Sequence, residues 1–315
     1  MDSKTSHFWP SMPETDEREA VRENLVERVR RFVLENGESD ARVPGLHLSY
    51  VQTPDKVPNC FYVLSVGIIL QGRKHLNIGK QSYEYGAGSM IVTSVDMPTS
   101  YELLDVSPSK PFVSLSLRLN PAILADLIAA EPNTGEHRSK EVFSIDWAAK
   151  ELLEDFNRLL RLFERPEQIE TRAPLLIRDI HYLALAGAAG ESLRSLYAPG
   201  AVGQRIRRVI HWMRENFREP ITIEQLSNVA GMSSTTLHRH FKAFTSLSPV
   251  QYQKRLRLYE AQQFLIRGEG DVNSAAYAVG YQSPQQFNRD YKKFFGTTPG
   301  KSTKVTKKNL LTSIG

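Results

Sequence analysis

The feature that most constrains this chain is an internal repeat in its last third. The stretch VAGMSSTTLHRHFKAFTSLSP ends at Pro249, and AVGYQSPQQFNRDYKKFFGTTP ends at Pro299, fifty residues later. With that offset Arg239 falls on Arg289. The other aligned pairs are Leu237 with Phe287, Phe241 with Tyr291, Lys242 with Lys292 and Phe244 with Phe294. Repetition of apolar, basic and turn residues in register predicts two copies of one supersecondary unit.

Each copy carries the signals of two short helices joined by a glycine turn. These signals are Thr222 and Asp271 as N-caps of the first helices, Gly231 and Gly280 as C-terminal stops, and Ser233 and Ser283 as N-caps of the second helices. The predicted buried stripes of the second helices are Leu237-Phe241-Phe244 and Phe287-Tyr291-Phe294. This is the pattern of a helix–turn–helix, whose second helix enters the DNA major groove. Residues 250–266 predict a helix that joins the copies, with Tyr252, Leu256, Tyr259 and Phe264 facing inward.

The basic residues of the chain are concentrated in the same third. The whole chain of 315 residues carries a net charge of +5. Residues 203–308 hold 18 Lys and Arg against 7 Asp and Glu, a net of +11, which leaves −6 for the rest. A basic segment beside an acidic one favours a polyanion-binding module attached to a second domain. On charge alone, a merely solvated basic surface is the alternative.

Upstream of the repeat the sequence predicts a β-rich domain. Residues 45–120 contain short segments that are rich in β-branched and aromatic residues and are separated by Gly, Pro and Asp. Apolar and polar residues alternate from Val113 to Leu119. This texture predicts a compact antiparallel barrel or sandwich, with a hairpin turn at Gly79-Lys80.

Helical periodicity flanks the β-rich region on both sides. Residues 15–36 predict a first helix, and Pro121 suits the first turn of a second. The segments 145–163 and 172–188 carry two further apolar stripes, which could pack on each other, on the barrel or across a dimer interface. The Pro and Gly residues of 190–203 then predict a linker.

The repeated motifs point to a family. LSNVAGMSSTTLHRHFK, SPVQYQKRLRLYEAQQFL and VGYQSPQQFNRDYKKFFGTTP resemble the DNA-binding domain of AraC-type (AraC/XylS family) transcription regulators, over about residues 203–302. ILQGRKHLNIGKQSYEYGAGSMIVTSVDMPTSYEL is similar to the cupin-like N-terminal domain of one subgroup. One departure is Asp290, which lies next to Arg289 and is predicted to repel phosphate.

Residue patterns and resemblance together predict an α+β chain. It has an N-terminal antiparallel, cupin-like β-barrel with flanking helices and a C-terminal all-α domain of two helix–turn–helix motifs. The expected division is a helical extension over 1–44, a cupin-like regulatory domain with C-terminal helices over 45–189, a linker over 190–203, a DNA-binding domain over 204–302 and a basic tail over 303–315.

The resemblance also names the residues that would touch DNA. It places base-reading positions at Thr235, His238, Arg239, Gln285, Asn288 and Arg289. Arginine can pair with guanine, and Gln or Asn with adenine. Lys242 and Lys292 are better suited to phosphate, which positions the protein without reading sequence. Two such helices on one domain predict that a single chain reads an asymmetric site across successive major grooves. The alternative is that one or both arginines only cap a helix or form a salt bridge.

The sequence argues against an enzyme, a cofactor and a bound metal. It contains no HExxH, P-loop or GxSxG motif. In residues 45–120 the histidines are His47 and His75, which form no HxH pair. Apolar runs fall short of the ~20 residues that span a bilayer, and the first residues lack the apolar core of a secretory signal. A cytoplasmic protein without a membrane partner is therefore expected.

Control of DNA binding is expected to come from the β-rich domain, through a small effector or through Cys60. Cys60 is the only cysteine, and it would be either a buried small apolar residue or a reactive sensor. The expected partners are double-stranded DNA, a small-molecule effector, RNA polymerase and a second copy of the chain docked through 145–188. Two alternatives stay open. The barrel could serve only as a partner surface, or a cupin-like small-molecule-binding or enzymatic domain could be fused to a nonspecific DNA-binding module.

Overall fold

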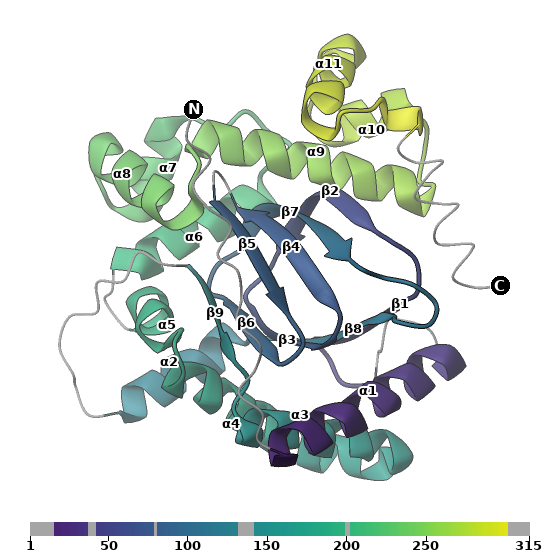
Figure 1. The fold of residues 1–315 in the computed structure, drawn as a ribbon. Helices are drawn as coiled ribbons and strands as arrows, with labels where there is room; N and C mark the ends of the chain where they lie inside the picture. Colours follow the sequence, from purple (N-terminus) through teal and green to yellow (C-terminus); the bar gives the residue numbers. More distant parts are fainter. Residues whose placement is uncertain (1–15, 37–41, 79–80, 132–141, 199–201, 302–315) are drawn as a thin grey trace. The chain divides into compact units, whose positions relative to one another are not determined.

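The computed structural model describes residues 16–36, 42–78, 81–131, 142–198 and 202–301. The chain divides into two compact units (Figure 1). The first comprises residues 1–57 and 62–204, and the second comprises 58–61 and 205–315.

The strands form two antiparallel sheets. The five-stranded sheet has the order β1-β8-β3-β6-β9, and the four-stranded sheet has the order β2-β7-β4-β5. The strands are β1 (Leu46–Val51), β2 (Lys56–Tyr62), β3 (Ser65–Gln71), β4 (Arg73–Ile78), β5 (Gln81–Gly86), β6 (Ser89–Thr93), β7 (Met97–Leu104), β8 (Phe112–Arg118) and β9 (Phe143–Trp147). The predicted antiparallel β domain is confirmed, whereas the strand pairings of the described residues do not close the sheets into a barrel.

The predicted hairpin turn at Gly79-Lys80 lies outside the described residues. The strands on either side pair as a hairpin would require, because Ile78 of β4 is opposite Gln81 of β5.

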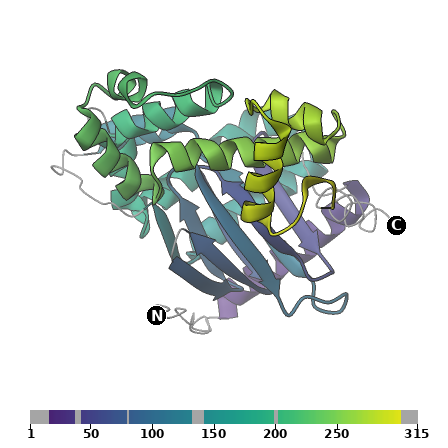
Figure 2. The same cartoon turned by 90° about the horizontal axis from the view of Figure 1, so that it is seen from above.

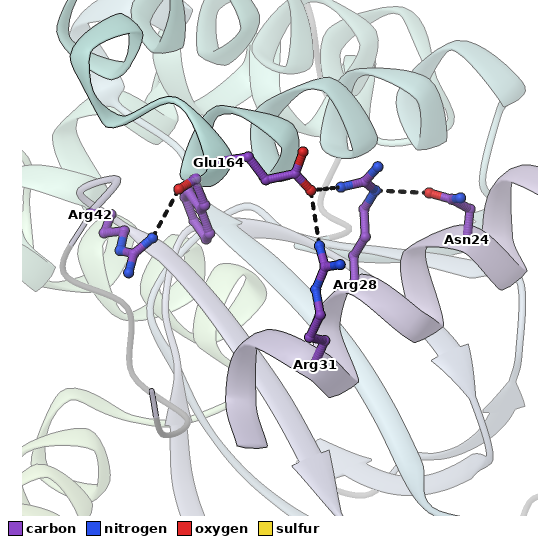
Figure 3. Close-up of polar contacts among 6 residues, drawn as sticks. Asn24, Arg28, Arg31, Arg42 and Glu164 are labelled. Carbon is purple, nitrogen blue, oxygen red and sulfur yellow. Dashed lines mark hydrogen bonds and ion pairs between the residues drawn. The ribbon is translucent and has the colours of Figure 1, made fainter. Parts of the chain in front are cut away.

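The first helix, α1 (Asp16–Asn36), belongs to the first unit and packs against α3 (Lys150–Arg161) and the five-stranded sheet. Leu25 and Val29 on its inner face are fully buried. Glu164 accepts hydrogen bonds from Arg28 at 2.7 Å and Arg31 at 2.9 Å, so one carboxylate joins two turns of the helix to the end of α3 (Figure 3). The helix predicted as an extension is thus an integral layer of the unit.

The remaining helices of this unit are α2 (Pro121–Ala130), α4 (Ile169–Ala186) and α5 (Gly190–Tyr197), with 3-10 turns over Leu162–Glu164 and Pro166–Gln168. His181 is buried on α4 and ties it to the start of α2. Its Nε2 accepts from the Asn120 N–H at 2.6 Å, and its Nδ1 lies 2.7 Å from the Ile177 carbonyl oxygen.

Two sequence predictions for this region were wrong. The stripe over 145–163 is not one helix, because Ile145 and Trp147 lie on β9, which pairs with β6. The first part of the linker predicted over 190–203 is helix α5, whose Leu193 and Leu196 are fully buried. In both cases long-range packing overrides a local signal.

The second unit is helical from residue 205 onward. Its helices are α6 (Val202–Glu215), α7 (Ile223–Ala230), α8 (Ser234–Thr245), α9 (Pro249–Arg267), α10 (Val272–Ala278) and α11 (Pro284–Phe295). Both views show α7 and α8 toward one end of α9, and α10 and α11 toward the other (Figure 1, Figure 2). Tyr252 and Leu256 of α9 are buried as predicted, while Tyr259 and Phe264 are only half-buried.

Candidate nucleic-acid interface

The first helix–turn–helix is formed by α7 and α8, and its turn is built by the predicted residues. Thr222 and Gln225 form a capping box at the start of α7. Gly231 ends α7 in the left-handed conformation, with φ of 60°. Ser233 then caps α8 by accepting from the Thr236 N–H. Local hydrogen bonds therefore fix where α8 begins and in which direction it leaves the turn.

The second helix–turn–helix is formed by α10 and α11 and repeats this design. Asp271 caps α10 by accepting from the Ser274 N–H at 2.7 Å. Gly280 has a φ of 85°, and Ser283 caps α11. A Cβ atom on Gly280 would lie 1.9 Å from the Arg218 carbonyl oxygen, so this turn needs glycine for space as well as for backbone conformation.

Helix α8 separates its apolar and polar residues as predicted. Leu237, Phe241 and Phe244 are buried. The four predicted contact residues of this helix, Thr235, His238, Arg239 and Lys242, are all exposed. His238 and Arg239 lie three and four residues after Thr235 and four and three residues before Lys242, so the four residues share one solvent face of the helix.

Helix α11 presents a matching face. Phe287 and Tyr291 are buried, but Phe295 completes the stripe in place of Phe294, which is half-buried. Gln285, Arg289 and Lys292 are exposed, and Asn288 is half-buried. The Asn288 amide nitrogen donates to the Pro284 carbonyl oxygen at 2.8 Å, which leaves its side-chain oxygen directed away from that bond.

Asp290 forms contacts within the second unit that the sequence did not predict. Only 17% of its side chain is exposed, and its Oδ1 lies 2.6 Å from the Lys254 Nζ of α9. Its other oxygen lies 3.4 Å from the Tyr281 hydroxyl. The carboxylate therefore joins α11 to α9, and its charge is paired with that of Lys254. The predicted repulsion of phosphate stays a prediction.

Arg257 of α9 is a structural centre that the sequence reasoning missed. Its guanidinium donates to the carbonyl oxygens of Phe217 at 2.7 Å, Arg218 at 2.9 Å and Gly280 at 2.9 Å. Burial lowers the pKa of Arg257. These bonds link the segment before α7 to the turn after α10, and so hold the two helix–turn–helix motifs on one frame. An arginine among the other charges of a long helix gives no sequence signal of this role.

The other predicted candidates lie in the rest of the chain. Cys60 lies on β2 and is half-buried. Among the described residues, no three or more His, Cys, Asp or Glu side chains gather as they would around a metal ion. The helices in the described ranges include none that is long and apolar enough to cross a bilayer.

Two family models match different parts of the chain. Residues 42–192 match the AraC-type transcriptional regulator N-terminus, and residues 226–304 match a helix-turn-helix domain. The boundary between the matches falls in the region where the structure passes from the first unit to the second.

Individual relatives agree with this division. The HTH-type transcriptional activator RhaS of Escherichia fergusonii is 30% identical over 95 residues, which are 30% of this chain and 34% of that protein. RhaS of Salmonella schwarzengrund is 27% identical over 150 residues, 47% of this chain and 53% of that one. The matches thus span about a third to a half of these curated relatives. Wild-type ToxT from Vibrio cholerae, solved with an unsaturated fatty acid bound, superposes on 82% of this chain and 94% of its own with a TM-score of 0.57 and 11% identity.

Proposed function

The chain belongs to the AraC-type transcriptional regulators, a family of DNA-binding proteins rather than enzymes, and we propose that it reads a specific DNA sequence with α8 and α11. The observation that carries this proposal is the repeated exposed face. Arg239 and Lys242 on α8 recur as Arg289 and Lys292 on α11, fifty residues later, and all four are exposed.

We assign different tasks to the two kinds of residue. Arg239 and Arg289 have the planar donor groups that pair with guanine, and Gln285 suits adenine. Asn288 uses one amide N–H in its bond to Pro284, and we propose that its side-chain oxygen accepts from a base. Thr235 and His238 complete the face of α8, whereas Lys242 and Lys292 contact phosphate.

A single chain would read an asymmetric site. The two helices differ in sequence at the reading positions, so the two half-sites they select differ as well. Arg257 supports this arrangement, because it holds both motifs on one frame.

The test is selection of bound fragments from random DNA by the full chain, followed by affinity measurement on the selected sequence. Arg239→Ala and Arg289→Ala should each weaken specific binding by ~1–3 kcal/mol and relax the base preference at one position. Arg267→Ala is the matched control, because Arg267 lies at the end of α9 and pairs with Glu269. Selection without an enriched sequence would instead support a nonspecific DNA-binding module.

The first unit is proposed to regulate this binding. The RhaS relatives are activators and ToxT was solved with a fatty acid, which supports activation through RNA polymerase in response to a small effector. Cys60 chemistry is the competing input, and an unchanged transcriptional response in Cys60→Ser would remove it. A homodimer through α3 and α4 fits the exposed Leu175 and Tyr182 of α4, and the sedimentation of the full chain tests it.

A further inference from the structure

Helix α9 carries both helix–turn–helix motifs of the second unit. It spans Pro249–Arg267, 19 residues, and is therefore about 28 Å long. The motif of α7 and α8 lies toward one end of α9, and the motif of α10 and α11 lies toward the other (Figure 1, Figure 2). Successive major grooves on one side of a duplex are about 34 Å apart. The length of α9 is thus close to the separation that two reading helices need, and the attachments of the motifs to α9 determine how strictly that separation is kept.

The joint between α8 and α9 is fixed by local hydrogen bonds and by ring packing. The Thr245 hydroxyl is buried and donates to the Phe241 carbonyl oxygen at 2.7 Å. Ser248 and Gln251 form a capping box at the start of α9. The rings of Phe241 and Tyr252 are both buried and meet edge to face, with their centres 5.5 Å apart. The direction of α8 relative to α9 is therefore set by groups that lie close together in the sequence.

The second motif follows α9 through a turn that contains two glycines. Gly268 ends α9 in the left-handed conformation, with φ of 73°, and Gly270 lies two residues further on. Glycine restricts the backbone less than any other residue, so this turn alone holds α10 and α11 only weakly. Their orientation is therefore expected to depend on contacts with side chains of α9.

Arg257 in the middle of α9 makes the first of these contacts. Its guanidinium donates to the carbonyl oxygens of Phe217 at 2.7 Å and of Arg218 and Glu219 at 2.9 Å, all in the segment before α7. It also donates to the carbonyl oxygen of Gly280 at 2.9 Å, in the turn between α10 and α11. A guanidinium holds its N–H donors in one rigid plane. The segment before the first motif and the turn of the second are therefore held at a fixed distance.

The two segments that Arg257 joins also lie directly against each other. A Cβ atom on Gly280 would be 1.9 Å from the Arg218 carbonyl oxygen. Gln253, one turn before Arg257 on α9, adds hydrogen bonds to the carbonyl oxygens of Phe217 at 3.0 Å and Glu219 at 2.7 Å. Movement of the second motif toward this segment is thus blocked by backbone contact, and movement away from it breaks hydrogen bonds.

Two further side chains of α9 attach the reading helix α11 itself. The Lys254 Nζ lies 2.6 Å from Oδ1 of Asp290, the residue after Arg289. The guanidinium carbon of Arg255 lies 5.2 Å from the centre of the Phe294 ring, a cation–π contact. These contacts fix the rotation of α11 about its own axis, next to the arginine that is proposed to read a base.

We propose that these side chains of α9, which we call the α9 brace, set the spacing between half-sites that the protein accepts in DNA. The α9 brace consists of Gln253, Lys254, Arg255 and Arg257. The proposal rests on the proposed function, because it concerns how the two reading helices act together. One inserted base pair moves one half-site by about 3.4 Å and turns it by about 35° around the duplex axis. A braced pair of helices cannot follow both changes, so it loses contacts at one half-site. The four side chains are positioning residues, since they act through α8 and α11.

The experiment compares the affinity of the full chain for three duplexes. They are the operator selected from random DNA and two derivatives with one base pair inserted or removed between its half-sites. The unaltered chain should bind each derivative at least about tenfold more weakly, a loss like that of one or more base contacts. This ratio of affinities is the measure of spacing selectivity.

Arg257→Lys is the variant that tests the brace. It keeps the positive charge, but an ammonium group cannot reproduce the planar set of bonds to four carbonyl groups. It should lower the ratio about threefold or more, the effect of losing one or two hydrogen bonds, with unchanged base preference within each half-site. Arg267→Lys is the matched control on the same helix, because Arg267 pairs with Glu269 outside the brace, and it should leave the ratio unchanged.

Lys254→Gln is a second variant that should keep the fold, because ion pairs at the surface contribute little to stability. It releases Asp290 of α11 and should lower the ratio in the same direction. Repulsion of phosphate by the released carboxylate would weaken binding at every spacing alike, so it would leave the ratio unchanged. The ratio therefore separates positioning from a general loss of affinity.

An unchanged ratio in an Arg257→Lys protein that still melts cooperatively would overturn the proposal, and so would equal binding of all three duplexes by the unaltered chain. If Arg257→Lys does not melt cooperatively, the ratio in Lys254→Gln decides, and no change there has the same consequence. Selection that enriches no sequence with two half-sites contradicts the proposed function itself. Two half-sites whose spacing selectivity does not depend on the brace contradict only the present proposal.

Discussion

Two residues in the left-handed conformation end the proposed reading helices. Ser246 ends α8 with φ of 60°, and Gly296 ends α11 with φ of 71°. They occupy the same repeat position, fifty residues apart. The first copy therefore carries a side chain where the second copy has the residue that adopts this conformation without strain.

Ser246→Gly should stabilise the second unit by roughly 0.5–1 kcal/mol, because it removes left-handed strain that slightly exceeds the added chain entropy. Hydrogen exchange of the α8 amides in the full chain measures the change. Gly296→Ser is the reciprocal variant and should lower protection in α11. A loss of protection in Ser246→Gly would contradict the account.

The turn glycines allow a second comparison at this scale. The Cβ atom added by Gly231→Ala would have no other atom within 4 Å. Only backbone strain should therefore lower the free energy of unfolding, by about 1 kcal/mol. Gly280→Ala must also displace the Arg218 carbonyl, which accepts a hydrogen bond from Arg257. Gly280→Ala should lower the free energy of unfolding by at least ~2 kcal/mol more than Gly231→Ala, because the clash is with backbone rather than with a flexible side chain. Urea unfolding of both variants checks the order, and equal costs would refute the steric reason.

At the scale of elements, α3 and α4 meet at a pair of carboxyl groups. Asp155 of α3 is 2% exposed, and burial and the nearby Asp179 of α4 raise its pKa to about 6. Arg158 lies 3.0 Å away and only partly offsets this. The ionised carboxylate is thus less favourable in the folded chain than in the unfolded one.

The raised pKa of Asp155 determines whether the stability of the fold rises or falls with pH. A raised pKa contributes stability that is fully present below about pH 4 and is lost as pH rises through about 6. Asp155→Asn should therefore stabilise the first unit by up to about 3 kcal/mol at pH 8 and by little at pH 4. Thermal unfolding at both pH values measures it, with Glu154→Gln as the control on the same helix. A variant that is equally stabilised at both pH values would show that ionisation is not the cause.

At the scale of the whole molecule, the uneven distribution of charge predicts how DNA affinity depends on salt concentration. The basic segment carries both proposed reading helices, and each of them has an exposed lysine that we propose contacts phosphate. Binding to DNA releases counterions in proportion to the phosphates contacted. Affinity should therefore fall steeply with salt.

Lys242→Ala and Lys292→Ala should each reduce the slope of log affinity against log salt by about 0.9, for specific and nonspecific DNA alike. Lys56→Ala, which removes a 71% exposed lysine of the first unit, should leave the slope unchanged. Binding of labelled duplexes over a salt series measures it. An unchanged slope in both reading-helix variants would place the phosphate contacts elsewhere.

The features that could be predicted from the sequence are those set by interactions between residues close together in the chain. Caps, turns and apolar stripes depend on neighbours within a few residues, so the sequence alone correctly predicts Thr222, Ser233 and Ser283 as caps. The antiparallel character of the β region was also readable from alternation. The contact residues of α8 and α11 lie on the expected faces, and their role in reading DNA stays a prediction.

Only tertiary structure decided the features that join distant segments. Trp147 lies on a strand because β6 offers a partner, and Leu193 lies on a helix because its stripe is buried. Asp290 pairs with Lys254, and Arg257 donates to four carbonyl groups up to 40 residues away in the sequence. The sequence by itself determined the repeat, its caps and its charge, since these are local or additive. The sheets and the joint at Arg257 required the fold, because each depends on which remote residues are brought together.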